Sequence, residues 1–225
     1  MTDDPNNLSG YILESPFDVI ERHHLTISNV LAYQGRIGTT AWERFTYASP
    51  TPLRQEDPSL VAPPYHYPII ARRSRHRILV LSFSTKVIEY LLHNTLKATF
   101  RSPLKHVPIA VDALVKALTA KPTNYVLSFA HSRVPAFGVS LRAISYYGED
   151  LAEASLFRDS IPLTQFFTCG LRLAAGGAEL VRLGSEGMIS FYYRDENTIR
   201  DVEKALSFLY KAGYLTADIL KAREG

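Results

Sequence analysis

The densest run of apolar residues in the chain covers residues 78–83, with the sequence ILVLSF. This run is too short and too rich in β-forming residues for a solitary helix, so it predicts a strand that is buried on both faces at the centre of a sheet. Ser84 and Thr85 follow, and either hydroxyl can cap a helix over residues 86–94. A strand followed by a polar turn and a helix can also bind phosphate, because the N-terminus of the helix presents free N–H groups. Such a phosphate-binding turn normally contains glycine, and this one contains none, so the sequence favours a turn that only caps the helix.

Alternation of apolar and polar residues with a period of two predicts further strands. Residues 25–33 and 37–47 alternate in this way, and Gln34 and Gly35 between them predict the turn of a β-hairpin. The second half of the chain has five more alternating segments: residues 125–131, 137–147, 165–173, 179–183 and 188–193. The last three of these segments predict an antiparallel meander.

The same alternation predicts which side chains share a face. One face of the strand over residues 125–131 is expected to carry Tyr125, Leu127, Phe129 and His131. One face of the strand over residues 165–173 is expected to carry Phe167, Cys169, Leu171 and Leu173. We therefore expect His131 to be a half-buried, hydrogen-bonded side chain rather than a metal ligand. We expect Cys169 to be a packed core thiol, because free cysteine is among the most buried residue types.

Helical spacing of apolar residues appears in two longer segments. Residues 108–120 carry Pro108 in the first turn and an apolar stripe behind it. Residues 198–212 predict an amphipathic C-terminal helix, capped by Asn197 or Thr198 and ended by Gly213. With one or two helical turns over residues 151–158, the pattern predicts an α+β fold: a mostly antiparallel sheet with a few covering helices.

The domain organisation follows from the polar and proline-rich stretches. Residues 1–10 are polar and acidic and predict a disordered lead, and residues 11–225 predict a single α+β domain. Six prolines within residues 49–68 disfavour both a helix and a central strand, so this loop is a candidate internal boundary. Inside it, Tyr65, His66 and Tyr67 form either a binding loop or part of a connector, and the composition favours the connector.

Composition narrows the class of protein. The 225 residues are 46% hydrophobic, which is enough for a substantial core. The single cysteine rules out an intramolecular disulfide and a cysteine-rich zinc site. No apolar segment approaches the roughly 20 residues that cross a bilayer, and the first ten residues lack the features of a signal peptide. We therefore expect a cytoplasmic protein without a membrane partner.

Positive charge is concentrated in one place. The net charge is only +3, but one short cluster contains Arg72, Arg73, Arg75, His76 and Arg77. Arginine binds phosphate and carboxylate groups through two parallel hydrogen bonds, so the cluster favours an anionic partner. If it continued as one strand, three of the arginines (73, 75 and 77) would share a face, with the fourth opposite. The competing interpretation is a solvated edge before a buried strand.

Catalytic motifs are absent from the sequence. It contains no GxSxG, GxGxxG or GxxxxGK[ST] pattern and no pair of histidines at metal-binding spacing. The best carboxylate cluster is Glu149 and Asp150, with Arg158 nearby. These acids are more simply explained as caps of the following helix.

Two functional hypotheses follow. The first is a non-catalytic binding or scaffolding subunit of a larger cytoplasmic assembly, which contacts a protein or nucleic acid through the basic cluster and the aromatic loop. A protein partner or a homo-oligomer is expected, with nucleic acid as a further candidate. The alternative is a metal-dependent enzyme acting on nucleic acid or on a phosphorylated substrate. No cofactor and no resident metal site is predicted.

Overall fold

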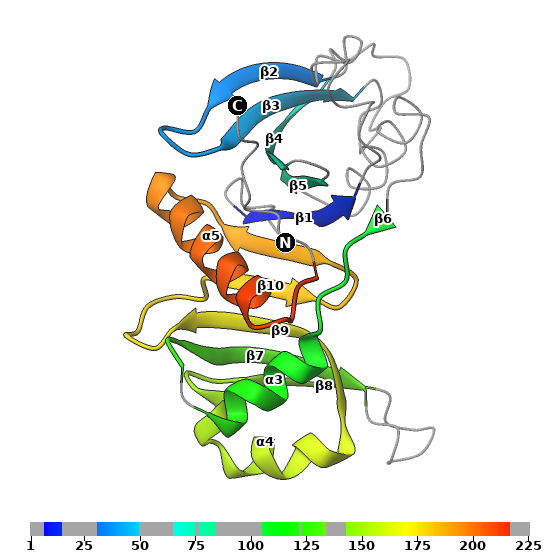
Figure 1. The fold of residues 1–225 in the computed structure, drawn as a ribbon, viewed down its shortest axis with the longest axis vertical. Coiled ribbons are helices and arrows are strands. Elements are labelled where there is room, and N and C mark those ends of the chain that lie inside the picture. The colour runs from blue at the N-terminus through cyan, green and yellow to red at the C-terminus, as the bar shows by residue number, and fades with distance from the viewer. Residues whose placement is uncertain are drawn as a thin grey trace, which may run out of the picture. The chain divides into compact units, whose positions relative to one another are not determined.

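The structure is a computed structural model that describes residues 7–14, 31–49, 65–74, 77–83, 105–121, 123–133 and 143–216. These residues form mostly antiparallel strands and three α-helices, which confirms the α+β prediction (Figure 1). The chain divides into two compact units: unit 1 comprises residues 1–106, 193–199 and 219–225, and unit 2 comprises residues 107–192 and 200–218. Lys105 and His106 pair with Glu14 and Leu13 of unit 1, whereas Ile109 pairs with Leu215 of unit 2.

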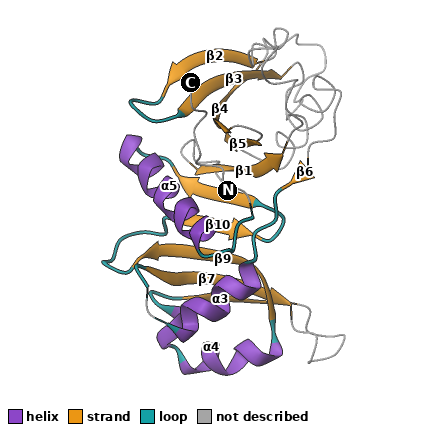
Figure 2. Cartoon of the chain, viewed as in Figure 1, coloured by secondary structure: helices purple, strands orange, loops and turns teal. Residues whose placement is uncertain are grey.

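Unit 1 is an antiparallel sheet with the strand order β2-β3-β4-β5-β1, and β6 pairs with β1 (Figure 2). Its strands are β1 Asn7–Glu14, β2 Leu31–Arg36, β3 Trp42–Ser49, β4 Tyr65–Ser74, β5 Arg77–Phe83 and β6 Lys105–His106. The predicted central strand is confirmed, because β5 lies between β4 and β1. The predicted helix over residues 86–94 and the strand residues before Leu31 lie outside the described residues.

The predicted hairpin is present, but its turn lies elsewhere. The prediction of a turn at Gln34 and Gly35 is wrong, because β2 continues through both residues. Tyr33 pairs with Phe45 while Gly35 pairs with Arg44, so Gln34 is an extra residue in a β-bulge. Gly35 has a φ of 124°, which suits a bulge as well as a turn.

The chain reverses instead between residues 37 and 41. Thr40 closes this turn, because its hydroxyl donates to the Ile37 carbonyl oxygen at 2.7 Å and accepts from the Trp42 amide at 3.2 Å. Thr39 donates from its amide and its hydroxyl to the Glu196 carboxylate, at 3.2 and 2.9 Å.

Two segments expected to lack structure contribute strand residues. The lead predicted over residues 1–10 is corrected at its end, because residues 7–10 open β1 and residues 8–10 pair with β5. The Pro-rich loop is likewise shorter than predicted, since Tyr65, His66 and Tyr67 belong to β4. Pro68 is tolerated there because β4 pairs with β5 only from Ile69 onward, so its missing N–H is not needed on that side.

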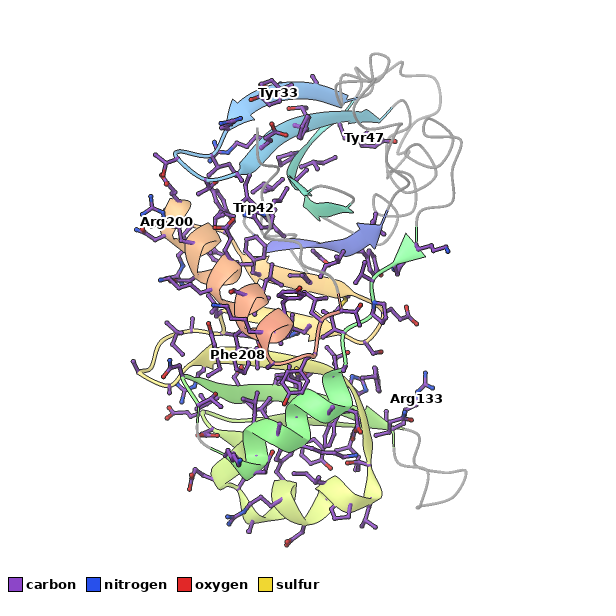
Figure 3. The ribbon with its side chains drawn as sticks, viewed as in Figure 1. Tyr33, Trp42, Tyr47, Arg133, Arg200 and Phe208 are labelled. Carbon is purple, nitrogen blue, oxygen red and sulfur yellow. The ribbon has the colours of Figure 1, made fainter. Side chains whose placement is uncertain are left out.

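The core of unit 1 is built on β3 and β4. Trp42 is completely buried, and Tyr47 is buried on the same strand (Figure 3). Ile69 and Ile70 are buried on β4, whereas Tyr33 on β2 stays largely exposed. The sole tryptophan is therefore a core residue.

The strands of unit 2 pair antiparallel in the order β11-β10-β9-β7-β8. Its strands are β7 Tyr125–Arg133, β8 Ala143–Tyr147, β9 Gln165–Leu173, β10 Val181–Gly184 and β11 Met188–Tyr192. The predicted meander of the last three strands is confirmed by their pairing. Its helices are α3 Val111–Ala120, α4 Ser155–Ser160 and α5 Glu196–Lys211. The first turn of α5 is counted with unit 1. The short 3-10 turns η2 Leu151–Glu153 and η3 Ile161–Leu163 lie beside α4 in the chain.

The helices of unit 2 pack on one face of this sheet (Figure 2). The buried stripe of α3 is the predicted one and consists of Val111, Leu114, Val115 and Leu118. Phe208 of α5 contacts Tyr125 of β7, with ring centroids 5.0 Å apart (Figure 3). Phe157 of α4 contacts Phe166 of β9 at 5.5 Å. This helical face holds the core of unit 2.

The C-terminal helix begins and ends close to its predicted limits. Its predicted buried positions are confirmed, because Ile199, Val202, Leu206 and Leu209 have no exposed surface. The predicted caps are wrong: Asp195 caps the helix by accepting a hydrogen bond from the Thr198 amide at 3.0 Å. Gly213, with a φ of 78°, follows the last turn as expected. No helix within the described ranges is long and apolar enough to cross a membrane.

Candidate functional site

A bulge in β7 decides which side chains leave the helical face of unit 2. Leu127 pairs with Leu171 of β9, and Phe129 pairs with the adjacent Gly170. Ser128 is therefore an extra residue, and a one-residue slip moves every later side chain to the other face. The prediction that Phe129 and His131 share a face with Leu127 is wrong for this reason.

A second bulge lies in β9. His131 pairs with Thr168, but Ser132 pairs with Phe166, so Phe167 is the extra residue. Phe166 is buried on the helical face, while Phe167 contacts the ring of His131 on the opposite face at 4.5 Å. The predicted common face of Phe167 and Cys169 is therefore also wrong.

The two bulges create what we call the open face of unit 2, defined by Phe129, His131, Arg133, Tyr147, Phe167 and Arg182. No described helix of unit 2 packs on this face. The rings form a connected series, because Phe129 lies 5.0 Å from Tyr147 and 6.4 Å from His131, which in turn contacts Phe167. Tyr147, on the terminal strand β8, is 73% exposed.

An arginine lies over each of two rings in the series. The Arg182 guanidinium carbon is 4.3 Å from the Phe129 ring centroid, and that of Arg133 is 5.5 Å from the centroid of Phe167. Both distances lie within the range of cation–π attraction. Four strands thus supply four rings and two guanidinium groups to one surface.

Glu179 holds one end of this arrangement in place. Its carboxylate pairs with Arg182 at 2.9 Å and accepts a hydrogen bond from the Ser128 hydroxyl at 3.2 Å. A Cβ atom added at Gly170 would lie 2.0 Å from Oε2 of Glu179 and 3.0 Å from Cβ of Phe129. Glycine at this position therefore leaves the space in which Glu179 and Phe129 lie over β9.

The charge of the open face and its margins is positive. Arg172 pairs with Val126 across β9 and β7 and donates to the Glu149 carbonyl oxygen. Together with Arg133 and Arg182 it gives three arginines among the described residues, with Glu179 beside Arg182 and Glu149 beside Arg172. Arg133 is exposed, and the Arg182 side chain is 39% exposed. The surface therefore offers cationic groups beside one exposed ring, Tyr147, and two partly exposed rings, His131 and Phe167, while Phe129 is buried beneath them.

The predicted basic cluster is only partly described. Arg72 is buried, with 6% of its surface exposed, and it pairs with Trp42 across β4 and β3. Arg73 pairs with Ile78, and Arg77 pairs with Ser74, so the chain does not continue as one strand through the cluster. The shared face expected for residues 73, 75 and 77 depends on one continuous strand, and β4 and β5 are two separate strands. Arg75 and His76 lie outside the described residues.

The side chains of Tyr65, His66 and Tyr67 are likewise outside the described part of the chain, although their backbone lies in β4. Sequence reasoning had selected these residues and the basic cluster, and it missed Arg133, Tyr147, Phe167 and Arg182. One signal was available: in the segment FAHSR, two rings and an arginine alternate with small residues, which places all three on one face of a strand.

The candidate catalytic groups do not converge in the described residues. Asp150 accepts a hydrogen bond from the Ala152 amide at 3.0 Å, so it caps the 3-10 turn η2, as the capping interpretation expected. Among the residues that the structure describes, no three His, Cys, Asp or Glu side chains lie close enough to hold a metal ion. Cys169 is completely buried, and this burial, aided by the Glu179 carboxylate, raises the pKa of its thiol to about 12. A thiol with such a pKa is not a nucleophile at neutral pH.

Comparison of the sequence with known protein families finds no match. No curated protein matches it either.

Proposed function

We propose that this chain is a non-catalytic binding subunit that contacts nucleic acid through the open face of unit 2. The observation that carries the proposal is the series of four rings, with Tyr147 exposed and with Arg133 and Arg182 over two of the others, on a face that no described helix of unit 2 covers. Guanidinium groups bind phosphate through charge and directed hydrogen bonds, and aromatic rings stack on bases. Arginine and aromatic residues are also enriched in protein interfaces, so the binding experiment below decides whether the partner is a nucleic acid.

A binding role is also favoured by how the acidic groups are used. The Glu179 carboxylate beside the open face is engaged by Arg182 and Ser128. Asp150 is engaged as a cap. The proposal therefore places the protein within a larger assembly as the part that grips a nucleic acid, with any chemistry supplied by other subunits.

The test is equilibrium binding to fluorescently labelled oligonucleotides at several salt concentrations. Wild type is compared with Arg133→Ala, which removes an exposed guanidinium group. The matched control is Arg158→Ala, because Arg158 is also an exposed arginine but lies on α4. We expect saturable binding that weakens with salt, and a slope of log affinity against log salt that falls by about one in Arg133→Ala alone.

A third variant, Arg73→Ala/Arg75→Ala, tests the basic cluster of unit 1. If it alone weakens binding, nucleic acid is bound by that cluster and the open face is not the site. If no oligonucleotide binds at low salt, the proposal of nucleic acid as the partner is wrong.

A further inference from the structure

We infer that the open face takes single-stranded nucleic acid, with one base stacked on Tyr147 and the backbone held by Arg133 and Arg182. This inference rests on the proposed function and specifies its ligand. It follows from the exposure of Tyr147, the spacing of the rings and the placement of the charges.

The exposure of Tyr147 indicates a vacant stacking surface. Its ring packs against Phe129 at 5.0 Å, yet the residue is 73% exposed. A tyrosine on a strand is ordinarily half-buried against its neighbours. Here the contact with Phe129 fixes the ring on one side, and the other side remains accessible to a planar group. Phe167 is a second partly exposed ring, held between His131 and Arg133.

The rings do not suit a duplex as the stacked ligand, because they contact one another and a duplex leaves no free base face to stack on them. Neighbouring rings on the open face lie 4.5 to 6.4 Å apart. Bases in a duplex stay stacked at roughly 3.4 Å and present only their edges in the grooves. Protein rings can stack on bases only where the strand is unpaired and its bases can separate. A duplex could use the arginines but would leave the rings without a partner.

The charges fit a backbone that crosses the strands of the sheet. Arg133 lies at the end of β7 with its guanidinium group over Phe167, and Arg182 lies on β10 with its guanidinium group over Phe129. Glu179 neutralises part of the charge of Arg182, whereas the Arg133 guanidinium group makes no ion pair within the described ranges. We therefore expect Arg133 to contribute more to phosphate binding than Arg182.

The experiment compares one 12-nucleotide sequence as a labelled single strand, in RNA and in DNA form, with the same sequence in a blunt duplex. Wild type should bind the single strand at least tenfold more tightly than the duplex. Tyr147→Ala should weaken single-strand binding about 5- to 150-fold, from the known value of one base–ring stack. Tyr147→Phe keeps the ring and should bind within about twofold of wild type.

Controls separate stacking from folding and from charge. Tyr210→Ala removes another partly exposed tyrosine, on α5, and should bind as wild type does. Tyr147→Ala should keep the salt dependence of wild type, while Arg133→Ala should reduce it. Retention of the native circular dichroism spectrum and melting temperature by Tyr147→Phe and Tyr147→Ala would show that the sheet is intact.

The outcomes distinguish this inference from the proposed function. Equal binding of single strand and duplex, with Tyr147→Ala unchanged, would overturn the single-strand inference and leave nucleic-acid binding standing. Failure of every oligonucleotide to bind would overturn both. A preference for RNA or for DNA among the single strands would support the inference and identify the natural ligand.

Discussion

The buried thiol of Cys169 makes a quantitative prediction about stability at alkaline pH. The residue lies on the helical face, where it pairs with Ala130 and Leu183 of the neighbouring strands. Burial, with a smaller contribution from the Glu179 carboxylate, raises the pKa of the thiol from 9.0 to about 12. The unfolded chain therefore releases this proton at a lower pH than the folded protein does.

The direction of the effect follows from proton linkage. Because the folded-state pKa is raised, the stabilisation is complete below pH 9 and is lost as the pH rises toward 12. At pH 10 an unfolded thiol is about ten to one ionised, which lowers the free energy of unfolding by RT ln 11, or about 1.4 kcal/mol. At pH 11 the loss reaches about 2.7 kcal/mol.

The assay is urea unfolding of wild type and Cys169→Ala at pH 8, 9, 10 and 11 under reducing conditions. Tyrosines and lysines titrate in both proteins, so the difference between the two isolates the thiol. The variant should have a lower free energy of unfolding than wild type at pH 8, because the sulfur contacts are lost. Between pH 8 and pH 10 the difference in free energy of unfolding should change by about 1.4 kcal/mol in favour of the variant. A difference that stays constant over this range would refute the burial argument, as would rapid labelling of the native thiol at pH 8.

Three further predictions concern packing and capping. Leu206→Ala should lower the free energy of unfolding by about 2–5 kcal/mol in a urea titration, because Leu206 is fully buried. The control Leu156→Ala should change it by less than about 0.5 kcal/mol, because Leu156 is 77% exposed. Asp195→Ala should lower the melting temperature at neutral pH. Because the Thr198 hydrogen bonds hold the pKa of Asp195 below its usual 3.8, the melting temperatures of wild type and variant should converge only as the pH falls through that lowered pKa. A difference that stays constant at acid pH would contradict the cap. Gly38→Ala should lower the melting temperature more than Gly176→Ala. Both glycines have positive φ, but only at Gly38 would the new methyl group collide with the Glu196 carboxylate, at 1.9 Å. Equal decreases in melting temperature would show that the collision is relieved without cost.

Helical elements were predictable because their signal is redundant. Each turn of α3 and α5 adds another apolar residue to the same stripe, so one ambiguous position does not change the prediction. The limits of β9 and the central position of β5 also followed from their composition. The cap of α5 was missed by two or three positions, since several adjacent polar residues can each accept an amide hydrogen bond.

The candidate site was not predictable in the same way. Alternation has no redundancy: a single extra residue reverses all later assignments, and Ser128 and Phe167 each do so. The density of charge was also misleading, because Arg72 contributes to the predicted cluster but is buried beside Trp42. A local count of arginines takes no account of the strand that carries them or of the neighbours that cover them.

The two bulges have a consequence for how such a surface arises and disappears. A substitution alters one side chain. The gain or loss of a single residue at Ser128, in contrast, moves every later side chain of β7 from one face of the sheet to the other. Evolution could therefore acquire or abandon this ring-bearing surface through one short insertion or deletion, with almost no change in composition. The number of residues in β7 and β9 should therefore be a better criterion for relatives that have kept the surface than the identity of any single residue on these strands.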